Sequence, residues 1–183
     1  MVSSNEMSLI LLSFAGFASH LGLDLVKQTF EAAAVTVQEK DQTHERSVAT
    51  AGPPSFSTVG DIGNGPFVVM AVDADPPPPF IAQIRHFLGP NFFSEVRTIG
   101  PADIRALVNT TPAIEEFIQP APVPGTGAHR YNFLLFNQPE GFNSQTLVNS
   151  STSIFNFSLS VFAAKTGLGD PIAGNFMLVA PDT

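Results

Sequence analysis

The chain has 183 residues and carries 16 acidic side chains against 8 Lys and Arg, which gives a formal net charge of −8. A surface that binds DNA or RNA needs clustered basic side chains, so this balance argues against a nucleic acid as a partner. Hydrophobic residues make up 44% of the chain and 17 residues are Phe, enough apolar surface for a folded core. The absence of cysteine excludes disulfides, cysteine-ligated zinc and thiol nucleophiles.

An apolar run near the N-terminus, Leu9 to Ala18, is too short to span a bilayer, which takes about 20 residues. Its length and position are typical of a secretory signal peptide, so residues 1–19 are predicted to be one. The flank before it contains Glu6 and no Lys or Arg, which leaves a buried or frayed N-terminal helix as the alternative. No later segment is long and apolar enough to cross a membrane.

Three N-x-S/T sequons begin at Asn109, Asn149 and Asn156. Such triplets are acceptors for N-glycosylation in exported proteins. Together with the signal peptide they predict a secreted, extracellular glycoprotein, with a vacuolar destination as the alternative.

Downstream of the signal, the apolar stripe of Leu23 to Ala34 predicts a helix, and the polar residues 36–56 read as a loop or linker. An unbroken apolar run, Phe67 to Val72, predicts a strand covered on both faces. It ends before four prolines, Pro76 to Pro79, which lack the N–H groups that a sheet needs.

A second strand is predicted at Tyr131 to Phe136, after a loop rich in proline and glycine at residues 120–127. A short helix is expected from Ser153 to Lys165, with a glycine placed to end it, and a last strand at Phe176 to Val179. Together these elements predict one β-rich domain, residues 20–183, with small helices at its edges.

Two carboxylates, Asp73 and Asp75, stand where the first strand meets the prolines. Side chains two residues apart on an extended chain point to one face, so the pair could hold a ligand group or a metal, or orient a histidine. The alternative is that both carboxylates accept backbone N–H groups and cap the turn.

His86 and His129 each lie in a segment that enters a strand. On an extended chain, His129 and Tyr131 share a face while Arg130 points away. Each histidine alone could be structural, but the two segments together suggest a site. The residues Gly125-Thr126-Gly127 let a backbone approach a ligand closely and offer N–H groups to an anion.

Other chemistry has no motif in this sequence. The glycine loop matches neither the Walker A nor the dinucleotide pattern, and there is no G-x-S-x-G or H-E-x-x-H. The two histidines and two aspartates fit no known metal spacing. Neither a cofactor nor a metal is therefore predicted.

The sequence resembles the phosphatidylethanolamine-binding protein family, most closely its secreted fungal type. The resemblance spans about residues 51–183. The stretches that carry it occur in the family's order and are Val72–Pro77, Gln83–Leu88, Gly125–Tyr131 and Phe155–Leu178, with Leu25–Phe30 similar to the family's first helix.

The resemblance implies a β-sandwich-like domain with a small pocket at one end that accepts phosphate-type head groups. Family members bind lipid headgroups, modulate signalling or inhibit proteases, and are not established enzymes. The residues that the resemblance places in or at the rim of this pocket are Asp73, Asp75, Pro77, His86, Gly127, His129 and Tyr131.

The sequence departs from the family pattern at two places. The family loop usually reads Asp-Pro-Asp-Ala-Pro, whereas residues 73–77 read Asp-Ala-Asp-Pro-Pro, which alters the rigidity of the loop. The family also has more strands before Ala51, where this chain has a polar stretch. The sandwich is therefore expected to lack N-terminal strands or to have an open edge.

The leading hypothesis is a non-catalytic binding protein for a phosphate-type anion or phospholipid headgroup. Its affinity should fall in His129→Ala and rise as the pH drops toward about 6. The alternative is an inhibitor of a serine protease or carboxypeptidase that acts through a protein surface. A hydrolase using an Asp–His pair, and a structural remnant with a lost pocket, are the other hypotheses.

Overall fold

The structure is a computed structural model. It describes residues 9–14, 44–45, 50, 52–59, 61–80, 82–99 and 102–181. The helix expected at Leu23–Ala34 lies outside these residues. Residues 9–14 form a strand, so the alternative of an N-terminal helix is not found there. Cleavage of a signal peptide stays a prediction.

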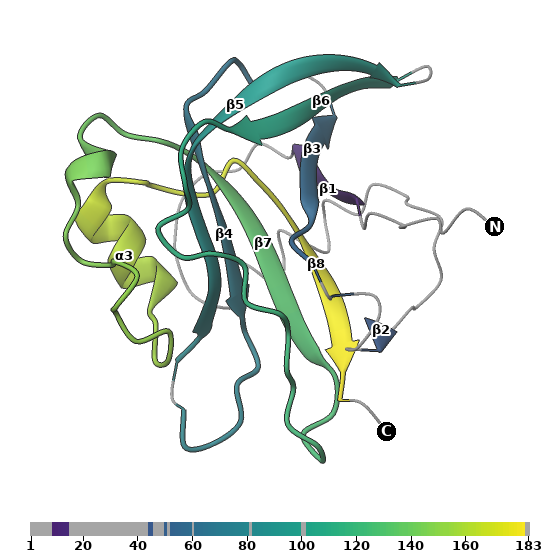
Figure 1. Cartoon of the computed structure of the whole chain (residues 1–183), viewed down its shortest axis with the longest axis vertical. Helices are drawn as coiled ribbons and strands as arrows, with labels where there is room; N and C mark the ends of the chain where they lie inside the picture. Colours follow the sequence, from purple (N-terminus) through teal and green to yellow (C-terminus); the bar gives the residue numbers. More distant parts are fainter. Residues whose placement is uncertain are drawn as a thin grey trace.

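Within the described residues the main feature is one strongly curled, mostly antiparallel sheet (Figure 1). The order of its strands is β1-β3-β6-β5-β4-β7-β8-β2. The strands are β1 (Leu9–Phe14), β2 (His44–Glu45), β3 (Ser55–Val59), β4 (Phe67–Asp73), β5 (Ile84–Ile99), β6 (Ala102–Asn109), β7 (His129–Asn137) and β8 (Ala173–Ala180).

The expected lack of N-terminal strands is wrong. β1 pairs in parallel with β3 and antiparallel with β8, so it joins the two sides of the sheet where an open edge was expected. β2 and the start of β3 both lie inside residues 36–56, which the sequence pattern had suggested to be loop. Periodicity does not reveal a two-residue strand, because alternation needs several residues to show.

The centre of the sheet is β4, which pairs with β5 on one side and β7 on the other. All of its residues are buried, as its unbroken apolar sequence predicts. Alternate side chains of β4 enter two cores on opposite faces of the sheet. One core contains Val69 and Ala71 with Tyr131 and Phe133, and the other contains Val68, Met70 and Val72 with Leu134 and Phe136.

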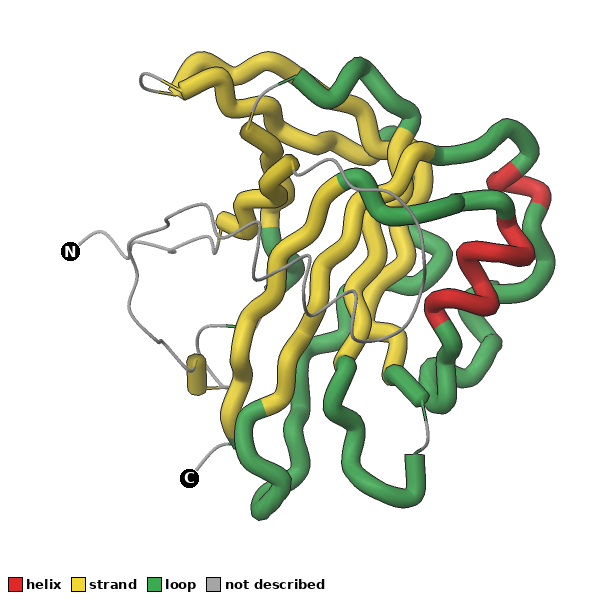
Figure 2. The backbone as a smooth tube through the Cα atoms, turned by 180° about the vertical axis from the view of Figure 1, so that it is seen from behind, coloured by secondary structure: helices red, strands yellow, loops and turns green. Residues whose placement is uncertain are grey.

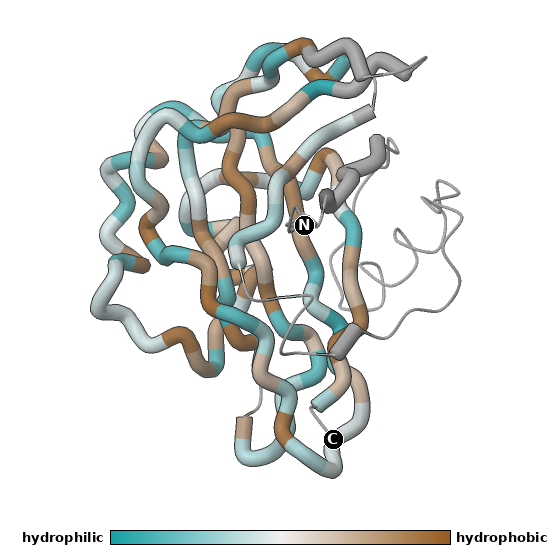
Figure 3. Tube along the Cα trace, turned by 45° about the vertical axis from the view of Figure 1, so that its right-hand side comes forward, coloured by the Kyte–Doolittle hydropathy of each residue, from teal (hydrophilic) through white to brown (hydrophobic). Residues whose placement is uncertain are grey.

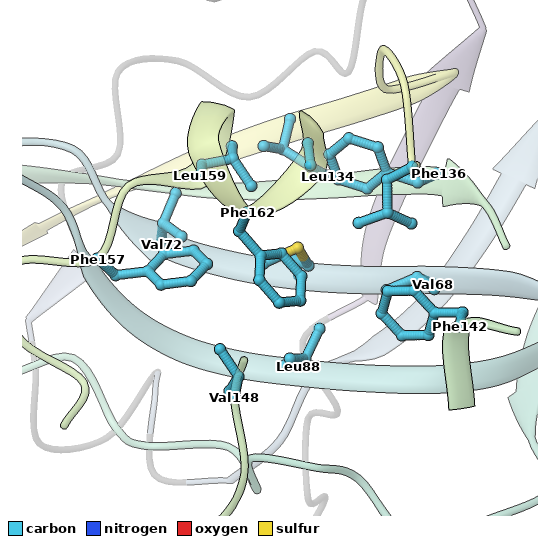
Figure 4. Close-up of a cluster of buried hydrophobic side chains, with 13 residues drawn as sticks. Val68, Val72, Leu88, Leu134, Phe136, Phe142, Val148, Phe157, Leu159 and Phe162 are labelled. Atoms are coloured by element: carbon cyan, nitrogen blue, oxygen red, sulfur yellow. The ribbon is translucent and has the colours of Figure 1, made fainter. Parts of the chain in front are cut away.

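The second core is covered by α3 (Leu159–Thr166), as Figure 4 shows for Phe162 and Leu159 above Val72 and Leu88. The helix begins later than predicted, because Ser158 caps its first turn by accepting the Val161 N–H. It ends as predicted, at a left-handed glycine, Gly167 with φ 74°. A 3-10 turn, η1 (Phe142–Ser144), adds Phe142 to the same core.

The hairpin of β5 and β6 was not predicted as two strands, although it is the longest feature of the sheet. Its distal part contains Ser94, Glu95 and an exposed Val96, which give no continuous apolar run. Seen from behind, strands fan across the molecule and the helix stands to one side (Figure 2). Figure 3 shows hydrophobic stretches along the strands and hydrophilic ones in most connecting loops. No described helix is long and apolar enough to cross a membrane.

Candidate functional site

The sequence-predicted site residues come together at one end of the sheet, where β4 ends and β7 begins. These strands are antiparallel, and their register places Asp73 opposite Tyr131. The loop after β4 and the loop before β7 therefore leave the sheet at the same end (Figure 1). Asp73, His86, His129 and Tyr131 are all buried there.

A chain of hydrogen bonds runs through His129. Its Nδ1 lies 2.8 Å from Oδ2 of Asp73, and both side chains are almost fully buried, with 2% and 3% exposed. Because a carboxylate only accepts, it holds a proton on Nδ1 of the ring. On the other side of the ring, Nε2 lies 2.7 Å from Oγ1 of Thr126.

His86 reaches the same cluster through an irregularity in β5. The β4–β5 register passes from Ala71 opposite Phe87 to Val72 opposite Arg85, so His86 is the additional residue of a bulge. Its ring meets that of Tyr131 edge-on, with centroids 5.0 Å apart. The ring of His129 stacks on the same tyrosine at 6.4 Å, so Tyr131 lies in contact with both imidazoles.

Burial favours the neutral form of His86. It lowers the pKa of His86 below the ordinary value of 6.5, and a hydrogen bond to the Ile118 carbonyl and the charges of Asp73 and Glu115 offset this only in part. Nδ1 donates to that carbonyl at 2.9 Å, which leaves Nε2 of the neutral ring as an acceptor. His86 is thus an acceptor rather than the charged donor that a simple pair of histidines would provide.

Asp73 and Asp75 were predicted to point to one face, but in the structure they do not. Asp73 accepts the Asp75 N–H through Oδ1 at 2.8 Å, so the chain turns immediately after β4 and the extended geometry ends. Asp75 instead binds Arg130, whose backbone N–H, Nε and Nη2 all donate to it, at 2.9, 2.7 and 2.6 Å. Asp73 therefore has both predicted roles, turn cap and histidine partner, while Asp75 holds the side of β7 that faces away.

These contacts explain the pKa directions of the ion pair. Burial alone would raise the pKa of Asp75, but the hydrogen bonds and the charge of Arg130 outweigh it and hold this pKa below its usual value. The same hydrogen bonds raise the pKa of Arg130. The pair fixes the end of β7 next to His129.

The remaining predicted residues, Pro77 and Gly127, lie in the loops after β4 and before β7. Pro77 is half-buried and its carbonyl accepts the Phe80 N–H at 3.2 Å. Gly127 is exposed, with φ 80°, a conformation that favours glycine. Among the described residues, no three His, Asp or Glu side chains converge as metal ligands would.

Two contributors were missed by sequence reasoning. Thr126 was considered only as part of a glycine segment whose backbone N–H groups could face an anion, although a hydroxyl between two glycines, three residues before a histidine, was a usable signal. Arg130 was expected to point away from the face that His129 and Tyr131 share, and its bonds to Asp75 were not foreseen. Nothing in the local sequence reveals that the Ile118 carbonyl faces His86, because that contact joins distant segments.

The order Asp73, His129, Thr126 resembles the carboxylate–imidazole–hydroxyl arrangement of some hydrolases. The hydroxyl of Thr126, however, also lies 2.7 Å from the carbonyl oxygen of Val123, to which it donates. Because its single proton is shared by that carbonyl, the hydroxyl is held in a turn rather than presented as a nucleophile. The arrangement therefore suits binding.

Fold and site together define a mainly β protein with a buried carboxylate–histidine pair at one end of a curled sheet. The model of the family described as "Phosphatidylethanolamine-binding protein" matches residues 28–177, most of the chain. The chain belongs to this family, and the fold expected from the resemblance is confirmed.

Curated relatives match over part of their length. Phomoidride biosynthesis cluster protein N of Talaromyces stipitatus is 33% identical over 102 residues, which is 53% of this chain and 50% of that protein. The 26 kDa secreted antigen of Toxocara canis is 42% identical over 58 residues, 30% of this chain and 22% of that protein. The chain thus spans half or less of the length of these relatives.

A solved structure shares the fold. The carboxypeptidase Y inhibitor, in a crystal structure of its complex with the cognate proteinase, superposes with a TM-score of 0.61 over 77% of this chain and 76% of that one. The two sequences are 18% identical, so the likeness is one of fold.

Proposed function

We propose that this chain is a non-catalytic binding protein whose Asp73–His129 pair and His86 bind a phosphate-type anion, either free or as a phospholipid headgroup. The observation that carries the proposal is the buried 2.8 Å contact of Asp73 with Nδ1 of His129. It directs the other ring nitrogen, Nε2, away from the carboxylate and toward the loop at the rim. A donor oriented in this way suits an anionic oxygen.

The two histidines would have different parts in such a site. Because Nδ1 holds one proton against Asp73, His129 would donate from Nε2 when its ring carries a second proton, and His86 would accept through its Nε2. A monohydrogen phosphate carries anionic oxygens, which accept hydrogen bonds, and one hydroxyl, which donates. Phosphoethanolamine adds an ammonium group, which is a further donor. Both ligands therefore match a donor paired with an acceptor, and an acidic protein can bind them because the recognition is local.

The test is calorimetric titration of the full chain with inorganic phosphate and with O-phosphoethanolamine. His129→Ala should lose binding, because the variant lacks the Nε2 donor. Lys165→Ala is the control, since this cation lies on α3, which covers the opposite face of the sheet. Equal affinities of the wild type and His129→Ala would overturn the proposal. Tighter binding of phosphoethanolamine than of phosphate would favour the headgroup as the source of the ligand.

Inhibition of a serine protease or carboxypeptidase is the second candidate, supported by the shared fold with the carboxypeptidase Y inhibitor. Residues 117–128 contain no charged side chain, and Val123 among them is 50% exposed, which suits an apolar contact with a protein. Val123→Asp should then weaken inhibition of a serine carboxypeptidase, while His129→Ala should not. Val161→Asp on α3 is the matched control, because Val161 is also 50% exposed.

We also propose that the chain is exported and glycosylated. The three sequon residues, Asn109, Asn149 and Asn156, are all exposed in the structure, so a glycan on each would reach solvent. A relative is named a secreted antigen, which supports export. Intact mass before and after peptide N-glycosidase treatment of protein from a eukaryotic host tests glycosylation. The N-terminal sequence of that protein tests cleavage after residue 19, which would remove β1 and leave β3 and β8 without its pairing.

A further inference from the structure

A short turn places a hydroxyl of the chain itself against the ligand-facing nitrogen of His129. Thr126 is exposed and His129 is buried, yet Oγ1 and Nε2 are 2.7 Å apart. The backbone N–H of Thr126 donates to the Val123 carbonyl at 3.1 Å, and the hydroxyl lies 2.7 Å from that same oxygen. The turn from Val123 to Thr126 thus aims the hydroxyl at the ring.

Both nitrogens of the His129 ring already have a hydrogen-bond partner within the protein. Nδ1–H donates to Asp73, and Nε2 shares its one hydrogen-bonding position with Thr126. The threonine has a single hydroxyl proton for two neighbours, the Val123 carbonyl and Nε2. The Val123 carbonyl can only accept, so it receives that proton, and the hydroxyl oxygen accepts from Nε2. An added ligand oxygen therefore finds this donor occupied.

The turn is able to move away without disturbing the core. The flanking glycines, Gly125 and Gly127, have φ of 88° and 80°, and a Cβ built at either one would have no atom within 4 Å. An added side chain at either position would therefore enter open space. The described contacts that hold Thr126 in place are the two bonds to Val123 and the bond to His129.

We infer that the Thr126 hydroxyl occupies the place of an anion oxygen at Nε2 of His129 and is displaced when the ligand binds. This rests on the proposed function. It also makes Thr126 a determinant of specificity. A charged oxyanion forms a stronger hydrogen bond than a hydroxyl and can displace it, whereas a neutral alcohol gains nothing over the threonine already present. The site would therefore select phosphate-type oxyanions over polyols.

The test uses two substitutions of Thr126 in the full chain. Thr126→Val has the same shape without the hydroxyl, and Thr126→Ser keeps the hydroxyl. Titration with inorganic phosphate should show an affinity about two- to tenfold higher in Thr126→Val, the range of one net hydrogen bond. Thr126→Ser should match the wild type. In long-range proton–nitrogen NMR spectra without ligand, the Nε2 signal of His129 should shift in Thr126→Val and stay in place in Thr126→Ser.

The outcomes separate this inference from the function on which it rests. If the wild type binds phosphate and Thr126→Val binds it equally or more weakly, displacement is wrong and the hydroxyl is either a ligand donor or inert. If neither protein binds phosphate or phosphoethanolamine, the proposed function is overturned, and displacement with it. An Nε2 signal unchanged in Thr126→Val would overturn the inference by itself, because the contact would not exist in solution.

Discussion

Asp73 and His129 lie 56 positions apart in the sequence, yet their side chains meet at 2.8 Å in the interior. The meeting depends on β4 and β7 being neighbours in register, which sets Asp73 opposite Tyr131, two residues from the histidine. Each partner alone would be costly to bury, because Oδ2 of the carboxylate would lack a donor and the ring N–H an acceptor. Together they give the ring one defined tautomer.

Replacing Asp73 by Asn should weaken phosphate binding about tenfold or more. The amide oxygen can keep the Asp75 N–H, but the amide NH2 group then faces Nδ1 and cannot accept its proton. The ring then carries its proton on Nε2 and donates to the ligand as a neutral group, which binds an anionic oxygen more weakly than a doubly protonated ring does. Calorimetry measures the affinity, and nitrogen NMR of the ring reports the tautomer.

Asp61→Asn is the control for this substitution, because Asp61 is a largely exposed carboxylate paired with Arg105. It should change neither the affinity nor the ring signals. An unchanged affinity in Asp73→Asn would show that the carboxylate is only a turn cap.

The parts of this structure that the sequence predicts are those governed by local patterns. The buried strand at Phe67–Val72 follows from an unbroken apolar run, and Gly167 marks the end of α3 because glycine tolerates the left-handed conformation found there. The resemblance added the convergence of His86 and His129 on one end of the sheet. All of these features could be stated from the sequence alone.

The parts that could not be predicted depend on pairing between distant segments. The β5–β6 hairpin is held by pairing along its whole length, whereas its distal part has no continuous apolar run from which a strand could be predicted. The bulge that turns His86 toward Tyr131 is a shift of one residue between β4 and β5, and no residue type signals it. Asp73 and Asp75 bind different partners, His129 and Arg130, because each meets a different side of β7. This difference likewise could not be predicted from the sequence.

Asp75→Asn should lower the free energy of unfolding by about 1 kcal/mol, reduced by solvent screening because both side chains of the pair are about 30% exposed. An amide cannot match a carboxylate toward three donors from Arg130. The pKa of Asp75 is lowered in the fold, so the carboxylate stabilises the protein above its unfolded value of 3.8, and this contribution is lost as the pH falls through the lower folded value.

Urea denaturation of Asp75→Asn and the wild type, at low and high salt, measures this contribution. The difference between the two proteins should shrink at high salt, since exposed charges are screened. A difference that grew with salt would mean that the substitution acts through packing and not through the ion pair.

Arg85→Ala should destabilise the fold by about 3 kcal/mol or more. The side chain of Arg85 is fully buried, donates to Glu115 at 2.9 Å and to the Thr152 carbonyl at 3.1 Å, and lies over the ring of Phe157. Removing it leaves a largely buried carboxylate without its partner and opens a cavity beneath the segment that leads into α3. Denaturant unfolding measures the loss.

Arg105→Ala is the matched comparison, because Arg105 pairs with the exposed Asp61 at 3.4 Å. Its cost should stay below about 1 kcal/mol. If the two substitutions lower the free energy of unfolding by similar amounts, the buried contacts of Arg85 only offset the free energy that its desolvation costs.

His86 should make the protein less stable in mild acid. Burial lowers its pKa in the fold below the ordinary value of 6.5, despite the opposing effects of the Ile118 carbonyl, Asp73 and Glu115, and His129 adds to the lowering. The unfolded chain therefore binds the proton first, so stability falls as the pH drops below about 6.5. Thermal unfolding from about pH 7.5 to about pH 5.5 measures this dependence.

His86→Gln removes the titrating ring while keeping a side-chain donor for the Ile118 carbonyl, so its unfolding temperature should decline less over this pH range than that of the wild type. The comparison isolates His86 because His129 and both neighbouring carboxylates are present in the two proteins. Parallel pH profiles for the two proteins would mean that the ring charges as readily in the fold as in the unfolded chain. In that case His86 would be a second cationic donor at the site, and its assignment as the neutral acceptor would be wrong.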